Sequence, residues 1–407
     1  MELMVEKKTK SEIKEEYIFS NKYFIFNKMM LKSTGLWPYQ DVWLKRGMMI
    51  LYITGFFSLM IPQVIRAVQE LYSENINLGL IIEFVCGIIL YVALIGRILM
   101  LTLQKTKMRF IYEEITWNWG EINDSGERAV LGRFCNIGRI LSIFYTAYIH
   151  ICMFFFVWSP ALGPMILNTF SNATYKKSIC IDAEYFVDQD EYFSYIFSHT
   201  VFVSLLSASI LTAFDSTFVL ITQHGIGLLH VLKYRLNKIS KIFEMSEYNF
   251  KDNTIIHTKI VSCIILHKKS LQFLKVIGST YDLYHFFIYS LLLASLSIFT
   301  IDVVVNLQDF ATVLRLLITW SALVMYMFYF NWPGQKIINS SEEIFEVIYL
   351  SNWYSYPLKT QKLIMFMLLR TGKRIFLKAG IFEMSFVTVG HIMKTAMSYF
   401  TVFISLL

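Results

Sequence analysis

The side chains best suited to recognise a small molecule lie at helical spacing inside apolar segments. Aromatic rings give a large contact area, and tyrosine or histidine heads can hydrogen-bond an ester, ketone or alcohol oxygen. A closed apolar cavity with one or two such groups would bind a volatile, mostly hydrophobic ligand. The candidate ligand-binding residues are Phe84, Ile88 and Tyr91, then Tyr148, Cys152, Phe155 and Trp158, then Tyr195, His199 and Phe202, and finally Thr319.

Ordinary packing between helices explains each of these residues as well as a ligand contact does. Tyr91, Tyr148 and His199 are the strongest candidates, because a polar head buried in lipid needs a hydrogen-bond partner. The sequence alone leaves both interpretations open.

A second candidate site lies at the end of the chain, where residues 396–407 are apolar except for Ser398, Thr401 and Ser405. Val402 and Leu406 are four residues apart and therefore share one face of a helix. A ring of such side chains can close a pore by excluding water. Packing against lipid or a neighbouring helix is the alternative.

No pattern in the chain indicates catalysis. We find no metal-ligand spacing, no glycine-rich phosphate loop and no nucleophile elbow, and the five cysteines are scattered without a disulfide framework. We therefore expect no enzyme, no cofactor and no metal. The net charge of +7 is explained by basic loops that face anionic lipid, so a nucleic-acid partner is not needed.

Composition indicates a membrane protein, since 56% of the residues are hydrophobic and only 16% are charged. A helix that crosses the hydrocarbon core needs about 20 apolar residues. Seven segments qualify, and the chain is predicted to be an all-α, polytopic membrane protein. The predicted spans are 47–66, 78–103, 138–159, 193–222, 278–305, 310–331 and 384–407.

The distribution of lysine and arginine predicts how these spans are oriented. Residues 105–139, 223–279 and 332–380 are rich in basic side chains, whereas the intervening connections are poor in them. Basic segments stay in the cytoplasm. We therefore expect a cytoplasmic N-terminus and an extracellular C-terminus, the reverse of a G-protein-coupled receptor. Asn172 begins the only glycosylation motif on a predicted outer loop.

The segments between the spans suggest a layout with an intracellular helical anchor module. Residues 223–279 are expected to continue helices four and five below the bilayer, and a further helix is expected at 359–371. We interpret this module as an oligomerisation platform. A solvated helical hairpin is the alternative. The predicted units are 1–46, a cytoplasmic segment with an interfacial helix near 22–36; 47–222, helices one to four; 223–279, the extensions; 280–331, helices five and six; 332–383, the anchor region; and 384–407, the pore-lining helix.

A few ionisable residues fall within or near the predicted spans. Glu83 and Arg97 are 14 residues apart, too far to pair, so each is expected to reach its nearest interface. Asp215 is expected to contact the inner module. Asp302 and Arg315 flank a short outer connection, across which they are predicted to pair.

The C-terminal quarter of the chain resembles the insect odorant receptors. The motifs that carry the resemblance are Ser351-Asn352-Trp353-Tyr354 with Pro357, the apolar helix 363–370 with Lys373 and Arg374, Leu377-Lys378-Ala379-Gly380, the stretch 394–401, and Gly35-Leu36-Trp37-Pro38 near the start, which is typical of the hymenopteran branch. The second inner loop is shorter than that of the obligate co-receptor, so the resemblance is to a ligand-tuned subunit. The closing signature of the gustatory receptors is missing.

The resemblance implies an odorant-gated, non-selective cation channel in the plasma membrane of olfactory sensory neurons. Such a subunit would form a heterotetramer with the co-receptor, bind a volatile ligand among helices two to six, and line the pore with helix seven. In the family the positions of Val402 and Leu406 form a hydrophobic gate beside a residue that is usually an amide, and this chain has Ser405 there. A gustatory-type or a metabotropic seven-helix chemoreceptor is the alternative; the metabotropic one requires an outside N-terminus.

Overall fold

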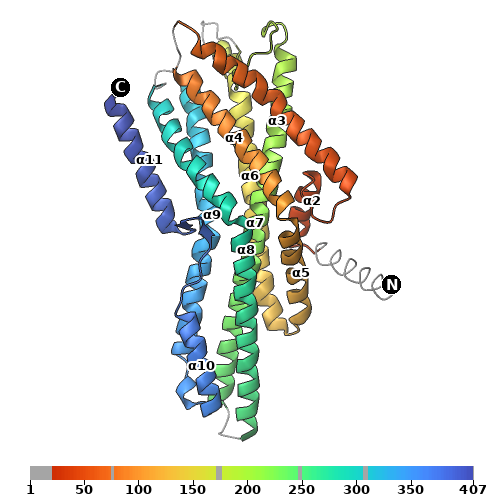
Figure 1. The fold of residues 1–407 in the computed structure, drawn as a ribbon, viewed down its shortest axis with the longest axis vertical. Coiled ribbons are helices and arrows are strands. Elements are labelled where there is room, and N and C mark those ends of the chain that lie inside the picture. Colours follow the sequence, from red (N-terminus) through yellow and green to blue (C-terminus); the bar gives the residue numbers. More distant parts are fainter. Residues whose placement is uncertain (1–20, 75–77, 171–176, 246–249, 306–309, 407) are drawn as a thin grey trace.

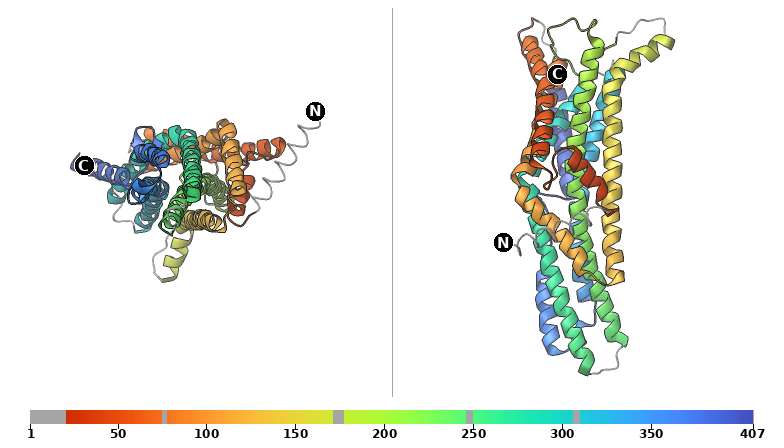
Figure 2. Two further views of the ribbon diagram at one scale, coloured as in Figure 1. Left: turned by 90° about the horizontal axis from the view of Figure 1, so that it is seen from below. Right: turned by 90° about the vertical axis from the view of Figure 1, so that its right-hand side faces the viewer.

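The chain forms an elongated, all-α bundle (Figures 1 and 2). The computed structural model describes residues 21–74, 78–170, 177–245, 250–305 and 310–406. The helices are α2 (Ile25–Ser33), α3 (Val42–Leu71), α4 (Leu78–Leu103), α5 (Lys105–Glu121), α6 (Ser125–Phe170), α7 (Phe193–Met245), α8 (Phe250–Val305), α9 (Phe310–Tyr349), α10 (Leu358–Thr371) and α11 (Phe386–Leu406), with a 3-10 turn at Trp353–Ser355 and an antiparallel pair of two-residue strands, β1 (Lys378–Ala379) and β2 (Phe382–Glu383).

The predicted all-α architecture is confirmed, and six of the predicted spans fall wholly within one helix each, with 384–407 covering α11. The span 78–103 coincides with α4. The Asp41 side chain caps the start of α3, because its Oδ1 accepts hydrogen bonds from the backbone N–H groups of Trp43 and Leu44 at 2.9 and 3.2 Å. Among the described residues, α3, α4, α6 and α7 are long and apolar enough to cross a membrane. The predicted spans in α8, α9 and α11 include side chains outside that description.

The two ends of the bundle differ in how many basic side chains their described connections carry. We call the upper end the one at which α3, α6, α8 and α11 finish, and the lower end the one that holds α10 (Figure 1). The described residues of two connections that are poor in basic side chains, 72–74 after α3 and 177–192 before α7, lie at the upper end, which is the predicted outer side. The connection 306–309 lies outside the described residues. The lower halves of α7, α8 and α9 extend, together with α10, well beyond the lower ends of α5 and α6 (Figure 1). These lower halves contain the basic segments 223–279 and 332–349.

The lower halves of α7, α8 and α9 form a packed core together with α10. The ring of Phe243 meets that of Tyr356 edge-on at 4.6 Å, and His257 Nδ1 lies 3.1 Å from Thr360 Oγ1. Burial, together with nearby Arg370, lowers the pKa of His267 to about 4, so this imidazole is neutral at physiological pH. The lower half is therefore a desolvated structural module.

The segment near 22–36 forms α2, one face of which packs into the bundle. Phe24 and Leu31 are buried, and the Asn27 side chain donates a 2.9 Å hydrogen bond to Ser216 Oγ of α7. Ile25 and Met29 remain exposed on the opposite face. The N-terminal helix is thus attached to the bundle core, and an apolar edge of it is left at the surface.

A buried ion pair joins α4 to α7 in the centre of the bundle. Arg97 Nε lies 3.2 Å from Asp215 Oδ1, and the side chains of Arg97 and Asp215 are only 2% and 0% exposed. The hydroxyl of Tyr145 on α6 donates to Asp215 Oδ2 at 2.8 Å. Arg97 Nη2 donates to Asp215 Oδ2 at 3.4 Å and to Tyr326 Oη on α9 at 3.0 Å. Four helices therefore meet at this ion-pair node of Arg97, Asp215, Tyr145 and Tyr326.

The predicted contacts of Arg97 with the nearest interface and of Asp215 with the inner module are wrong. Arg97 does not reach an interface, and Asp215 contacts the helices of the predicted spans instead of the lower module. A charge in hydrocarbon is costly unless it is paired, and the pairing satisfies both groups at once. The guanidinium also lies over the rings of Phe214 and Tyr284, at 5.8 and 5.5 Å from their centres, which adds favourable cation–π contacts.

Removing one partner of this pair should destabilise the receptor more than removing both. Arg97→Met leaves the Asp215 carboxylate buried without its cation, a change that typically costs about 3–5 kcal/mol. Arg97→Met combined with Asp215→Leu removes both charges and should recover most of that loss. Thermal unfolding of the detergent-solubilised receptor measures the difference. Equal melting temperatures for the single and double variants would contradict the role assigned to the pair.

Candidate functional site

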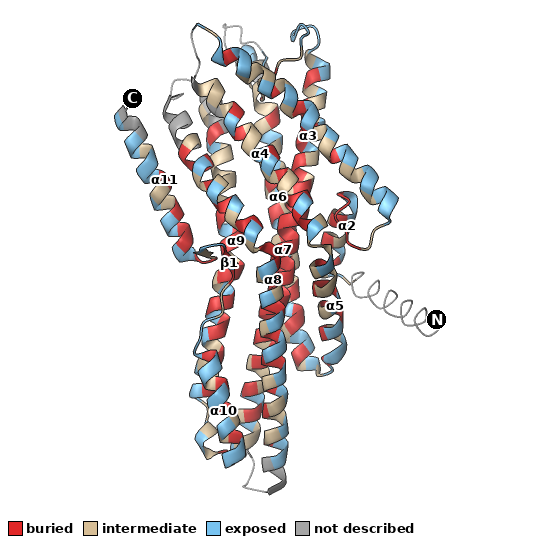
Figure 3. Cartoon of the chain, in the orientation of Figure 1, coloured by how far each residue is buried: buried red, intermediate tan, exposed pale blue. Residues whose placement is uncertain are grey.

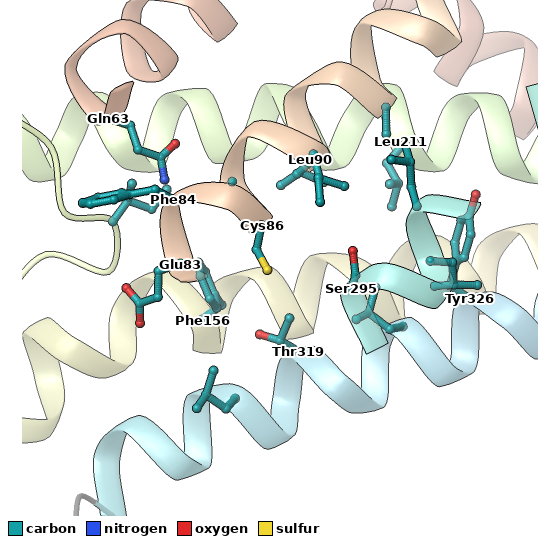
Figure 4. A pocket seen from close by; sticks show the side chains of 18 of the residues that line it. Gln63, Glu83, Phe84, Cys86, Leu90, Phe156, Leu211, Ser295, Thr319 and Tyr326 are labelled. Atoms are coloured by element: carbon teal, nitrogen blue, oxygen red, sulfur yellow. The ribbon is translucent and has the colours of Figure 1, made fainter. Parts of the chain in front are cut away.

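A cavity of about 220 Å³ lies in the upper half of the bundle, between α4, α8 and α9 (Figure 4). Helices α3, α6 and α7 contribute one residue each, and the connection between α6 and α7 covers part of it. The lining residues are Gln63, Glu83, Phe84, Cys86, Gly87, Ile89, Leu90, Ala93, Arg97, Phe156, Cys180, Ile181, Asp182, Leu211, Ile288, Leu291, Leu292, Ser295, Leu316, Thr319, Leu323 and Tyr326.

The size and lining of the cavity suit a small apolar molecule. Leucine and isoleucine side chains from α4, α7, α8 and α9 are the commonest residues of its wall. An apolar protein cavity of about 150 Å³ binds benzene. In proportion, this cavity has room for a ligand of about nine non-hydrogen atoms.

The upper end of the cavity is closed by α3 and by the connection that follows α6. The Gln63 amide on α3 lies against Gly87 on α4, so a side chain at Gly87 would require the Gln63 side chain to move. The connection is anchored where the Glu184 backbone N–H donates to the Pro62 carbonyl at 3.0 Å, and its Cys180 is buried. Gln63, Phe84 and Glu83 lie at this end in Figure 4.

The lower end of the cavity is formed by the ion-pair node. Arg97 and Tyr326 are the members of the node that line the cavity, and Tyr326 lies opposite Gln63 in Figure 4. Ser295 and Thr319 lie between the two ends. The cavity is therefore an apolar chamber with a charged donor group at its floor.

Two of the predicted ligand-binding residues, Phe84 and Thr319, line this cavity. Ile88 and Tyr91 lie on the same helix as Phe84 but outside the lining. Tyr91 is buried, with its ring 6.0 Å from that of Phe56 on α3. Its position within the bundle is thus a packing contact between α3 and α4.

The four candidates on α6 lie outside the cavity. The Tyr148 hydroxyl is 3.1 Å from Ser321 Oγ on α9, and Cys152 is half-buried nearby. Phe155 is 52% exposed on the surface of the bundle. Trp158 packs against aromatic rings of α6 and α7. Phe156, one residue from Phe155, is the α6 side chain that enters the lining.

The three candidates on α7 lie on its outer part. Tyr195 and Phe202 are 77% and 49% exposed. His199 bridges two elements, since its Nε2 is 2.8 Å from Ser58 Oγ on α3 and its Nδ1 is 3.1 Å from Tyr185 Oη. This histidine holds the α6–α7 connection and α3 against α7, beside the cavity and not in it.

Sequence reasoning did not select Gln63, Arg97, Ser295 or Tyr326, or the segment 180–182. For Arg97 a signal was present, because Arg97 and Asp215 are isolated opposite charges in two apolar segments, and each needs a partner in lipid. The polar residues Gln63 and Ser295 gave no such signal. Their helices turn them inward, and that rotation is not visible in the chain itself.

α11 stands at the edge of the bundle and packs on α8 and α9 through one face only (Figure 1). Ile392 and Ala396 are buried in that contact. On the opposite face Lys394, Val402 and Ser405 are exposed. The Leu406 side chain and the whole of Asn172 lie outside the described residues.

The base of α11 is attached to the two helices that form the cavity wall. Asp282 Oδ1 on α8 accepts a 2.6 Å hydrogen bond from the Gly380 backbone N–H, in the turn between β1 and β2. Gly380 has a φ of +62°, and a side chain there would collide with the ring of Phe286. On α9, Gln335 Oε1 accepts from the Phe386 N–H at 3.2 Å. Movement of α8 or α9 therefore acts directly on the start of α11.

Comparison with solved structures shows that this fold is known. The insect olfactory receptor OR5 from Machilis hrabei matches with a TM-score of 0.75, and its complex with eugenol with 0.74. In both cases 96% of this chain and 100% of the other are covered, at 13% sequence identity. At that identity the likeness concerns the fold alone.

Sequence comparisons identify the family. Odorant receptor 63a of Drosophila melanogaster is 24% identical over 191 residues, which cover 46% of this chain and 44% of that protein. The family model described as 7tm Odorant receptor matches residues 77–397, most of the chain. Proteins of this family are membrane receptors and not enzymes. The chain therefore belongs to the 7tm odorant receptor family.

Proposed function

We propose that this chain is the ligand-tuned subunit of an odorant-gated, non-selective cation channel. It binds a volatile hydrophobic molecule in the cavity between α4, α8 and α9. The apolar cavity is the observation that carries this proposal, because a cavity of about 220 Å³ within a bundle of this family fits a small odorant. The structure of OR5 in complex with eugenol describes a protein of the same fold with a small organic ligand.

The exposed face of α11 supports the assignment of the pore. Val402 is 55% exposed although it lies in an apolar helix, and Ser398 and Ser405 lie on the same face. Copies of this helix around a shared axis would bury that face and leave a hydrophobic ring at Val402 and Leu406. In this arrangement Ser405 is the polar neighbour of the gate.

Gating in this proposal follows from the contacts at the base of α11. A ligand shifts the equilibrium between closed and open states only by its preference for one of them. A ligand in the cavity touches Ile288, Leu292 and Leu323 on α8 and α9. These helices hold α11 through Asp282 and Gln335. A small change in their separation would therefore move the pore helix.

An apolar surface on the lower module supports assembly with co-receptor subunits into a heterotetramer. Leu350, Phe366 and Leu369 are 78%, 69% and 72% exposed. Phe366 and Leu369 belong to α10, which lies at the lower end of the bundle (Figure 3). Exposed apolar patches of this kind mark protein–protein contacts. The upper helices would be surrounded by lipid in the plasma membrane of olfactory sensory neurons, with Asn172 on the outer side.

Filling the cavity should abolish the odorant response. Ala93→Phe places a ring in the lining, whereas Val92→Phe adds the same ring on the adjacent residue, which is 53% exposed on the outside of α4. Whole-cell currents would be recorded from cells that express each variant with the co-receptor, against a panel of volatiles. We expect at least a tenfold loss of sensitivity for Ala93→Phe and an unchanged response for Val92→Phe. Equal responses from the two variants would refute the cavity assignment.

Reducing the side chains of the gate should weaken closure of the pore. Val402→Ala removes two carbon atoms from each gate side chain and Leu406→Ala removes three. Either change widens the hydrophobic constriction, so the resting current should rise or the ion selectivity should change. Met397→Ala is the control, because Met397 is 46% exposed on a different side of α11. Current–voltage curves without odorant measure the effect. Currents from both gate variants that match the control would argue against this gate.

A charge on the lower apolar patch should weaken assembly with the co-receptor. Phe366→Asp would place a carboxylate in the proposed contact, whereas Asn237→Asp adds a carboxylate on the exposed part of α7. Co-purification with a tagged co-receptor should fall several-fold for Phe366→Asp alone. Full recovery of the complex would show that this patch does not bind the co-receptor.

A further inference from the structure

We propose that the cavity selects neutral ligands that carry a hydrogen-bond-accepting oxygen at one end, with Arg97 and Tyr326 as the groups that bind this oxygen. The ligand class is a ketone, ester or similar oxygenated volatile of about nine non-hydrogen atoms. This inference rests on the proposed function and specifies its ligand. It adds two specificity-determining residues that the pattern of the sequence does not indicate.

The hydrogen bonds of Arg97 leave a donor at the cavity floor. A guanidinium carries five N–H groups. Four of them are used within the described part of the chain: two with Asp215, one with Tyr326 and one with the Ala93 carbonyl at 3.3 Å. The fifth, on Nη1, has no acceptor among the described residues. The Tyr326 oxygen accepts from Arg97, and its O–H lies beside the Tyr284 hydroxyl, which a ligand oxygen can replace as the acceptor. Because Arg97 and Tyr326 both line the cavity, an oxygen atom of a bound ligand can accept these hydrogen bonds.

The floor holds the strongest hydrogen-bond donor in the lining of this cavity, the Arg97 guanidinium. Hydrogen bonds from charged donors are roughly twice as strong as those between neutral groups. The hydroxyls of Ser295 and Thr319 are neutral, and the wall between them is leucine and isoleucine. A ligand with one acceptor is therefore oriented with its oxygen toward Arg97 and its apolar body toward the upper end.

The charges around the cavity favour a neutral ligand over an anion. Arg97 is already neutralised by Asp215 at 3.2 Å, so an anionic ligand would compete with a buried carboxylate. Glu83 and Asp182 line the cavity as well, with Glu83 at its upper end. A carboxylate ligand would meet repulsion from both and lose its hydration. A neutral dipole avoids these costs while its oxygen still reaches the floor.

A matched set of probes tests this inference on the receptor expressed with its co-receptor. Acetophenone, α-methylstyrene, benzoate and α-methylbenzylamine have the same number of non-hydrogen atoms and differ in the polar group. A second pair, methyl hexyl ketone and its methylene analogue, tests an open chain. We expect each ketone to act at about tenfold lower concentration than its hydrocarbon partner, and to be more potent than the acid and the amine. A hydrocarbon, acid or amine that equals its ketone, or no response to any probe, would overturn the inference.

Two tyrosine variants locate the selecting group. Tyr326→Phe should raise the half-maximal concentration of acetophenone about tenfold and leave that of α-methylstyrene unchanged. Tyr145→Phe is the matched control, because its hydroxyl also hydrogen-bonds a member of the ion pair, Asp215, but its side chain is not part of the lining. A structural effect would alter the response to both probes equally. An unaltered ketone preference in Tyr326→Phe would contradict the role of this hydroxyl.

The cavity-filling variant separates failure of this inference from failure of the proposed function. If Ala93→Phe abolishes all odorant responses but ketones show no advantage in the wild type, the cavity is the binding site and the ligand class is wrong. If Ala93→Phe responds normally, the cavity is not the site and both proposals fall. Responses to a direct agonist of the co-receptor confirm that each variant is assembled and at the cell surface.

Discussion

The buried pair of Arg97 and Asp215 is the constraint around which the upper bundle is organised. Each charge would cost about 2.5–3.5 kcal/mol or more within the hydrocarbon if it stood alone. The two groups come from helices that are far apart in the sequence, so the fold must bring α4 and α7 together at one depth. Tyr145 and Tyr326 complete the hydrogen bonding and thereby fix α6 and α9 at the same level. Few other arrangements of these helices would satisfy all four groups.

The ion pair lies between a closely packed lower part of the molecule and an upper part that contains a cavity. Below the node, α7 to α10 pack into a module with a buried core, and residues 212–229 of α7 are buried without interruption. Above the node, the helices enclose a cavity instead of packing fully against one another. The proposed ligand would therefore bind in the part of the bundle that holds a cavity, not in the packed lower module. Its energy can act on α8 and α9, whose lower contacts lead to the base of α11.

The sequence predicts the helices well because the bilayer dictates their length and composition. Residues 78–103 form α4 as predicted, since a continuous apolar stretch of that length has few alternatives. The cavity is harder to predict, because it depends on how each helix is rotated about its axis. Phe84 and Phe156 face the cavity, whereas Phe155 and Phe202 face outward, and all four are equally apolar. Only the packing of neighbouring helices distinguishes them.

Arg97 belongs both to the buried ion pair and to the cavity lining, which limits how the proposed ligand preference can vary. Its guanidinium stabilises the bundle through Asp215 and also forms the cavity floor, so substitution there alters stability and ligand binding together. Leu291 and Leu323, by contrast, contact the cavity as apolar wall residues, and changes in their size cost less than loss of a buried charge. Under the proposed function, preference for ligand shape can therefore change through the wall residues, while the proposed preference for an acceptor oxygen depends on the ion pair that joins α4 and α7.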